Sequence, residues 1–453
     1  MRLRERVGRL VTERVILVAG WIWFLAYGYP GYMSYDSAYE LAQARHVEKM
    51  NDWHPPVFSL LWRYTDWLFA GPFPILVIQS IVFVIGVRAL LRGVLPGRAG
   101  AIVTIAILLA PQTVVVVGVI WKDALMAGCV MCGIACLFTE RRPWRITGYV
   151  LIFLATALRY NAAAATLPIV VLQFGWKTAM PKWRRFALGS ALWVAIALGA
   201  VLLNSHYVQV KKYPWQVSVA MLDIAGTIRY AHHLDNDQLL ADTPGVPWHK
   251  TDKIQIRARS WYSAYSNFLT LTQEPGQIFD YPTTDEQMEA LTQAWKKMVF
   301  SYPFAYLRHR LGMFYAQLKI DDGLVWAEFN DPVFIDILNH RAMHSKFQRA
   351  WVDVMFKLEG TFVFRTSFYF FLAILLLPLT RGDRLAQVLL ASGLLYEMGL
   401  LVAAPAIGYR YSQWLVECTL IALVLTFVRR YRTSKHDVDR REHHEAVVGF
   451  AGE

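Results

Sequence analysis

The chain has 453 residues, of which 56% are hydrophobic and only 18% are charged, and its mean hydropathy is +0.31. These values exclude a soluble enzyme and predict a polytopic membrane protein, because the apolar residues gather in runs of about 17 to 22, the length that spans hydrocarbon. The formal charge of +12 comes from Lys and Arg beside those runs, where they orient helices, so we do not expect nucleic acid as a partner.

The order of apolar runs and basic loops along the chain predicts an all-α fold with about ten transmembrane helices. Five arginines between Arg2 and Arg14 precede the first apolar run, which places the N-terminus in the cytoplasm, and no cleavage site follows convincingly, so we expect an uncleaved signal anchor. Every second loop after that is strongly basic, which places both termini in the cytoplasm. The predicted spans are 15–29, 73–87, 99–119, 124–138, 146–158, 162–175, 186–203, 361–379, 385–404 and 411–428.

Residues 55–70 are apolar but contain Arg63 and Asp66. A charged residue at the centre of a spanning helix costs about 2.5 to 3.5 kcal/mol, and a span here would also place every later arginine-rich loop outside. We therefore predict two amphipathic helices on the outer membrane surface, at 37–49 and 55–69.

The remaining chain divides by composition. We predict an N-terminal transmembrane module at 1–205, with the interfacial helices at 37–69, and a small, mostly helical external module at 206–360. A C-terminal transmembrane module at 361–431 and a disordered cytoplasmic tail at 432–453 complete the chain.

Residues 300–318 have apolar side chains at helical spacing, but Arg308, His309 and Arg310 stand at the middle of the run. An eleventh span here would invert the orientation of everything that follows it. We therefore expect an interfacial helix or a helix of the external module.

The cysteines and the other metal-like patterns do not indicate a metal site. All four cysteines lie inside apolar runs, where we expect small packing residues and neither a disulfide framework nor a zinc site. The two Asp-x-Asp strings lie away from the core loops, and the His pair at i, i+4 has no third ligand between its members. The residues concerned are Cys129, Cys132, Cys136 and Cys418, Asp235 and Asp237, Asp437 and Asp439, and His340 and His344.

Polar residues that are unusual for a membrane chain converge on the outer side of this topology. Each has an ordinary interpretation as well: an N-cap, a snorkelling cation, an interhelical hydrogen bond or a turn before proline. Their occurrence on one face is what favours a functional site. The set consists of Asp36, Glu40 and His54, Lys122 and Asp123, Arg159 and Asn161, Arg410 and Tyr411, and Glu397.

Transfer of a sugar from a polyprenyl phosphate would use this combination of residues. A carboxylate must take the proton of the acceptor hydroxyl, and cations must hold the phosphate as it gains negative charge. We predict Asp36 as the catalytic base and a set of three basic residues as the donor-phosphate site. The predicted phosphate-binding residues are Lys122, Arg159 and Arg410, and the predicted supporting residues are Glu40, His54, Asp123, Asn161, Tyr411 and Glu397.

These motifs resemble the GT-C class of integral membrane glycosyltransferases, which includes the dolichol-phosphate-mannose protein mannosyltransferases and the bacterial aminoarabinose lipid A transferases. The resemblance rests on an Asp soon after the first span, two surface helices, and a long late outer segment. More closely, Asp36, the runs Asn51-Asp52-Trp53-His54-Pro55 and Trp121-Lys122-Asp123, and Leu158-Arg159-Tyr160-Asn161 are similar to a poorly characterised group of bacterial GT-C-like membrane proteins.

The resemblance covers residues 15–175 by motif and the rest by architecture. It implies Asp36 as catalytic base and an inverting transfer from a lipid-phosphate sugar. The chain departs from many members because Asp36 is followed by Ser37, with Glu40 next, instead of an adjacent acidic pair. We therefore expect no required cofactor and no protein metal site, with a divalent cation left open.

The predicted function is a multi-pass glycosyltransferase of the cytoplasmic (inner) membrane whose active site faces the periplasm or exterior. The expected partners are a polyprenyl-phosphate sugar donor, an envelope glycan, lipid or protein acceptor, and membrane lipids. The alternatives are a transporter or flippase of lipid-linked glycans, a polysaccharide polymerase or ligase, and a non-catalytic assembly protein.

Overall fold

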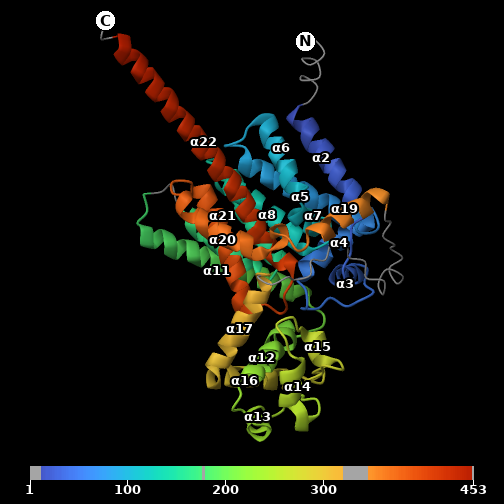
Figure 1. The fold of residues 1–453 in the computed structure, drawn as a ribbon. Helices are drawn as coiled ribbons and strands as arrows, with labels where there is room; N and C mark the ends of the chain where they lie inside the picture. Colours follow the sequence, from blue (N-terminus) through green and yellow to red (C-terminus); the bar gives the residue numbers. More distant parts are fainter. Residues whose placement is uncertain (1–11, 176–178, 320–344, 451–453) are drawn as a thin grey trace.

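The computed structural model describes residues 12–175, 179–319 and 345–450, and within these ranges the chain is helical, with isolated β-bridges and no strand. The long helices pack into one body, and a smaller group of helices forms a module at one end of it (Figure 1). The helices of the body are α2 Glu13–Gly28, α3 Tyr35–Ala44, α4 Pro56–Leu68, α5 Phe73–Leu91, α6 Gly97–Leu108, α7 Pro111–Val117, α8 Lys122–Leu137, α9 Arg142–Leu158, α10 Ala162–Gln173, α11 Lys182–Tyr207, α19 Lys346–Leu358, η3 Phe362–Phe364, α20 Thr366–Leu379, α21 Arg384–Ala403, η4 Tyr409–Ser412 and α22 Gln413–Phe450.

The module has its own apolar core. Ile224, Ile278, Phe279 and Leu291 are fully buried there and belong to a cluster separate from the larger core of the body. Its helices are η1 Trp215–Ala220, α12 Met221–Tyr230, α13 Asn236–Asp242, η2 Thr251–Lys253, α14 Ile254–Trp261, α15 Phe268–Thr272, α16 Asp285–Ser301 and α17 Pro303–Gln317.

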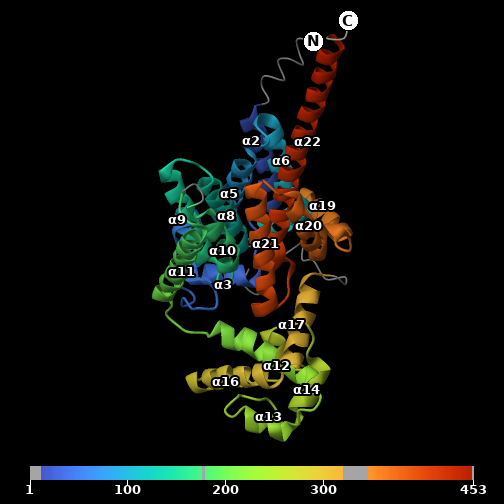
Figure 2. The ribbon, with the colours of Figure 1, turned by 90° about the vertical axis from the view of Figure 1, so that its left-hand side faces the viewer.

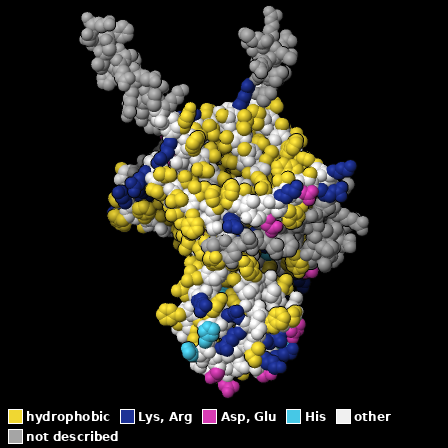
Figure 3. Space-filling model, viewed as in Figure 1, with side chains coloured by type: hydrophobic (Ala, Val, Ile, Leu, Met, Phe, Trp, Pro, Cys, Tyr) yellow, Lys and Arg dark blue, Asp and Glu magenta, His cyan; other side chains and the backbone are white. Residues whose placement is uncertain are grey.

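Surface composition separates the two parts. Hydrophobic side chains cover most of the visible face of the body, with Lys and Arg mainly toward its edges, whereas on the module Lys, Arg, Asp, Glu and His side chains lie among fewer hydrophobic ones (Figure 3). Helix α2 begins and α22 ends on the side of the body opposite the module, and α3 lies at the edge that faces the module (Figure 2). This arrangement is that of an integral membrane protein with a polar module on one side.

The helices of the body include four that are long and apolar enough to cross a membrane: Phe73–Leu91, Lys182–Tyr207, Arg384–Ala403 and Tyr409–Arg432. Helices α6 and α7 together are a fifth, but they bend by 68° at the break between them. Each of the ten predicted segments falls on a helix or on this pair, although several of those helices are shorter than a full span. The count of ten spans therefore stays a prediction.

Residues 99–119 are predicted as one span in which Pro111 could cause a break, and the structure has a break just before Pro111. Pro111 is the first residue of α7. Proline has no N–H for the hydrogen bond to the preceding turn, and its ring disfavours a continuing helix, so a new helix starts there.

The charges in residues 55–70 pair with the neighbouring surface helix. Arg45 at the end of α3 makes a two-pronged contact with Asp66 of α4, with Nε–Oδ2 2.9 Å and Nη2–Oδ1 2.8 Å, and Arg63 donates to the carbonyl of Ala44. Helix α4 also exposes aromatic side chains, with Trp67 82% exposed. Such side chains are typical of a helix lying at a membrane surface.

Two predicted boundaries differ from the structure. Helix α19 lies within 206–360 but packs on α2, where Gln348 donates to the carbonyl of Tyr27 at 2.9 Å and Trp351 stacks edge-on against the Tyr27 ring. Helix α22 continues as one helix to Phe450, through the segment predicted as a disordered tail. Extending a formed helix has no nucleation cost, and the Arg and Glu residues there are good helix formers.

Within residues 300–318 the structure has the end of α16 at Ser301 and then α17, Pro303–Gln317, a helix of the module. His309 and Arg310 of α17 are buried because Asp223 of α12 accepts hydrogen bonds from both, at 2.8 Å to His309 Nε2 and 2.7 Å to Arg310 Nη2. Trp295 of α16 donates to the same carboxylate at 2.7 Å. Burial lowers the pKa of His309, although Asp223 opposes that shift. A buried carboxylate thus accommodates the polar residues at the middle of this helix.

Candidate functional site

Asp36 lies in the first turn of α3, which Ser34 caps through the backbone N–H of Ser37. Arg410 of η4, which is 374 positions further along the chain, donates from Nη2 to Asp36 Oδ2. Both side chains are about one-fifth exposed, at 21% and 20%. The predicted base and one predicted cation therefore form a direct ion pair that solvent can reach.

Burial would raise the pKa of Asp36, but the positive charge of Arg410 and the nearby His54 and Lys122 hold it well below its usual value. The carboxylate is therefore ionised at neutral pH. A group in that state accepts hydrogen bonds and protons and does not donate them.

The Arg410 guanidinium lies between two aromatic rings. Its carbon is 4.9 Å from the centroid of Trp121 and 5.1 Å from that of Tyr411. The Trp121 indole N–H donates to Ser34 Oγ at 2.9 Å, which links this ring to the cap of α3. Cation–π contacts with two rings restrain the guanidinium, and a restrained guanidinium suits recognition of an anion.

His54 stands between Asp36 and a buried lysine. Lys122, the first residue of α8, contacts Glu40 Oε1 at 2.6 Å and His54 Nδ1 at 3.1 Å. An ammonium only donates, so Nδ1 must accept and, in the neutral ring, Nε2 carries the hydrogen. That nitrogen is 3.6 Å from Asp36 Oδ1. The imidazole N–H is thus aimed at the carboxylate of Asp36.

Arg159 and Asp123 form a second buried pair, with Arg159 Nη1 2.7 Å from Asp123 Oδ2 and side-chain exposures of 10% and 2%. The Arg159 guanidinium also lies 5.2 Å from the Tyr411 centroid. Asn161 donates to the hydroxyl of Tyr396 at 3.1 Å. Arg159 Nε, Asp123 Oδ1 and Asn161 Oδ1 are buried without a hydrogen-bond partner, so this region keeps unused donor and acceptor capacity.

Glu397 of α21 lies beneath the η4 turn. Ser412 Oγ donates to Glu397 Oε1 at 2.8 Å, and Oε2 has no partner. All ten predicted residues thus lie in one region, joined by these contacts or by direct sequence adjacency. We call them the Asp36 cluster: Asp36, Glu40, His54, Lys122, Asp123, Arg159, Asn161, Glu397, Arg410 and Tyr411.

The pairing in this cluster changes the expectation for two of the predicted phosphate ligands. Lys122 and Arg159 each have a buried carboxylate partner, Glu40 and Asp123, and are at most one-tenth exposed. A ligand entering from solvent would therefore meet Arg410 first. The two buried cations contribute positive potential behind it, and a direct contact would require them to exchange partners.

The sequence did not single out Trp121, Ser34, Ser412 or Gln317 as site residues. Trp121 directly precedes Lys122 and Asp123, and its position next to two charged residues was a signal in the sequence. No local pattern marked the others. Gln317 in particular is the last residue of a helix assigned to another module, and its partners lie about 90 positions away.

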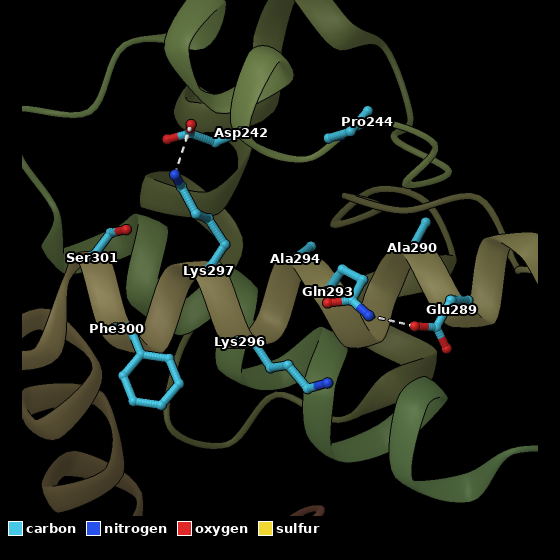
Figure 4. Close-up of a pocket in the computed structure, with 10 residues that line it drawn as sticks. All are labelled: Asp242, Pro244, Glu289, Ala290, Gln293, Ala294, Lys296, Lys297, Phe300 and Ser301. Atoms are coloured by element: carbon cyan, nitrogen blue, oxygen red, sulfur yellow. Dashed lines mark hydrogen bonds and ion pairs between the residues drawn. The ribbon is translucent and has the colours of Figure 1, made fainter.

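A hollow lies on the module, along α16 and the end of α13 with the residues that follow it (Figure 4). Its polar groups pair with one another: Lys297 Nζ lies 3.6 Å from Asp242 Oδ1, and Gln293 donates to Glu289. It shares no residue with the Asp36 cluster.

Within the described residues no group of three or more His, Cys, Asp or Glu side chains is placed to hold a metal ion. The four cysteines are free, two of them buried. The His340 and His344 pair lies outside the described residues. Whether a divalent cation takes part therefore stays a prediction.

The buried Arg159–Asp123 pair yields a stability prediction. Replacing Asp123 by Ala should destabilise the protein by about 3–5 kcal/mol, because the arginine would be left buried without a counter-charge. Lys297→Ala, which breaks the exposed pair with Asp242, should cost about 0–1 kcal/mol. Thermal unfolding of the purified variants in detergent measures both. Equal losses in the two variants would contradict the burial argument.

The fold and site thus define an all-helical membrane protein with a charged, partly open cluster on the module side. No family model and no curated protein matches the chain. Among solved structures it is similar to ArnT from Cupriavidus metallidurans bound to undecaprenyl phosphate, at 14% identity and a TM-score of 0.34 over 92% of this chain and 77% of that chain. The apo form gives 15% identity and a TM-score of 0.28 over 83% and 67%. Both TM-scores are below 0.5, so these similarities support no conclusion about the function of this chain.

Proposed function

We propose that the chain is a GT-C-type glycosyltransferase that moves a sugar from a polyprenyl phosphate to an envelope acceptor on the outer face of the cytoplasmic membrane. The observation that carries this proposal is the Asp36–Arg410 pair. An ionised carboxylate and a stacked guanidinium meet at a partly exposed point where the apolar body faces the polar module. A lipid-linked anion and a water-soluble acceptor would come together at such a boundary.

In the proposed reaction the acceptor oxygen attacks the anomeric carbon, and the bond from that carbon to the phosphate oxygen breaks. The acceptor proton passes to Asp36, and the polyprenyl phosphate leaves with the bonding electrons. Arg410 stabilises the charge that develops on the phosphate. Attack opposite to the leaving phosphate inverts the anomeric centre.

Donor binding would also change the basicity of Asp36. In the structure the guanidinium of Arg410 is engaged by the Asp36 carboxylate. A phosphate that takes over this guanidinium removes one of the charges that hold the pKa of Asp36 low. The pKa of the carboxylate then rises, and Asp36 becomes a better proton acceptor when the donor is in place.

A flippase for lipid-linked glycans is the second candidate, and the break between α6 and α7 is the observation that favours it. Transporters place their ionisable residues near the membrane midplane. The Asp36 cluster instead lies at helix ends: Lys122 begins α8, and Arg159 directly follows α9. This placement favours chemistry at the surface.

Mass spectrometry of lipid-linked sugars and envelope glycans tests the proposal. Cells that lack the protein should accumulate a polyprenyl-phosphate sugar and lose a substituent from an envelope component. Wild-type protein should reverse both changes, and Asp36→Asn should reverse neither. An unchanged glycan profile in the deletion strain would refute the proposal, and restoration by Asp36→Asn would point to transport.

A further inference from the structure

Helix α17 reaches from the module to the segment that carries Arg410 (Figures 1 and 2). Two of its residues, which are seven positions and about two turns apart, contact that segment. Arg310 Nη1 donates to the carbonyl of Ala404, at the end of α21, at 3.0 Å. Gln317 contacts Gly408, just before η4. The helix thus holds both ends of the connection between α21 and η4.

Gln317 binds both polar groups of one backbone residue. Its Oε1 accepts from the N–H of Gly408 at 2.9 Å, and its Nε2 donates to the carbonyl of Gly408 at 3.1 Å. Nε2 also lies 2.6 Å from Ser412 Oγ, and Ser412 in turn donates to Glu397. Because one planar amide engages both groups of Gly408, it fixes the direction of the backbone two residues before Arg410.

Buried hydrogen bonds also hold the part of α17 that contains Arg310. Arg310 is 2% exposed and donates to Asp223, which also accepts from His309 and Trp295. This carboxylate ties α17 to α12 and α16. A shift of α17 along its axis would break these buried bonds, so the helix gives the η4 turn a fixed support.

We propose that Gln317 is a positioning residue for Arg410. By clamping Gly408 it holds the η4 turn in the place where the guanidinium lies between Trp121 and Tyr411 and faces Asp36. This inference rests on the proposed role of Arg410 as the cation for the donor phosphate and extends it. It gives the module a part in the phosphate site, although within the described residues no hydrogen bond or ion pair joins a module side chain directly to Asp36 or Arg410.

The test uses the full-length protein in lipid nanodiscs, with Gln317→Met as the variant. Methionine keeps the length of the side chain and removes all three hydrogen bonds. Gln293→Met, on the exposed face of α16, is the matched control. If Gln317→Met is not recovered folded, Gln317→Glu replaces it, since that change keeps the oxygen that accepts from Gly408 and loses only the donor contacts.

Hydrogen exchange measured by mass spectrometry tests, without any ligand, whether Gln317 holds the backbone of Gly408. The peptide that contains Gly408 should exchange about tenfold faster or more in Gln317→Met and at the wild-type rate in Gln293→Met, because the Gly408 N–H loses its acceptor. Equal exchange in wild type and Gln317→Met would overturn the proposal.

Binding of undecaprenyl phosphate tests whether the loss of Gln317 impairs the proposed contact between Arg410 and the phosphate. Gln317→Met should weaken binding about tenfold and Arg410→Ala about 10- to 100-fold, and the double variant should be no weaker than Arg410→Ala, because the two residues act through one contact. Additive losses would overturn the positioning role. If wild type binds no undecaprenyl phosphate, the proposed function fails, while exchange at Gly408 still decides whether Gln317 fixes the turn.

Discussion

Asp36→Asn should reduce turnover about 10²- to 10⁴-fold, the contribution expected of a general base, while the protein still folds and inserts. Asparagine has the same shape and keeps an oxygen that can accept from Arg410, so the contact that joins α3 to η4 survives. It has no negative charge and cannot take the acceptor proton. Turnover of a sugar–polyprenyl phosphate by purified protein, together with a thermal melt, measures both parts.

The control for this variant is Asp66→Asn. Asp66 is also a carboxylate paired with an arginine on the surface helices, but its partner is Arg45 at the junction of α3 and α4. It should keep wild-type turnover. A purified Asp36→Asn protein that turns over at the wild-type rate would remove Asp36 from the catalytic role.

The pH dependence of stability follows from the same ion pair. The folded-state pKa of Asp36 lies well below the usual 3.8, so the stabilisation from its pairing is fully present above about pH 4 and is lost as the pH falls through the folded value. The difference in melting temperature between wild type and Asp36→Asn should therefore be constant near neutral pH and shrink in strong acid.

The sequence predicted the helices well because the solvent dictates them. Every backbone polar group in hydrocarbon must be satisfied within its own helix, so long apolar runs such as 73–87 and 385–404 become helices whatever their neighbours do. Boundaries that depend on packing were less predictable. The docking of α19 on α2 depends on Gln348 reaching the backbone of Tyr27, and no local pattern encodes that contact.

The sequence could group the residues of the Asp36 cluster because a charged residue at a span end is exceptional in this composition. Their pairing was not predictable. Asp36 meets Arg410 across 374 positions and Lys122 meets Glu40 across 82. Three cations in a row of outer loops suggested three phosphate ligands, but low dielectric requires a counter-charge for each buried one, and the structure supplies it for Lys122 and Arg159. Arg410, which is partly exposed, is therefore the residue for which the structure gives the most specific prediction about phosphate binding.

Arg410→Lys should weaken binding of undecaprenyl phosphate about 10- to 100-fold, nearly as much as Arg410→Ala. This range corresponds to loss of a charged hydrogen bond worth about 1.5–3 kcal/mol. Lysine keeps the positive charge but not the flat guanidinium that stacks between Trp121 and Tyr411 and reaches Asp36. Titration of the purified variants with the lipid in nanodiscs measures the effect.

Lys122→Ala distinguishes the effect of the stacked geometry of Arg410 from the effect of the net charge of the Asp36 cluster. It removes one unit of positive charge from the cluster, which Arg410→Lys does not. Lys122 is buried against Glu40 and His54, so its loss leaves the carboxylate of Glu40 uncompensated. We therefore expect Lys122→Ala to lower the melting temperature more than Arg410→Lys does, and to weaken lipid binding less. If Arg410→Lys bound the lipid as wild type does, a simple point charge would suffice at this position, and the stacked geometry would have no role in recognising the phosphate.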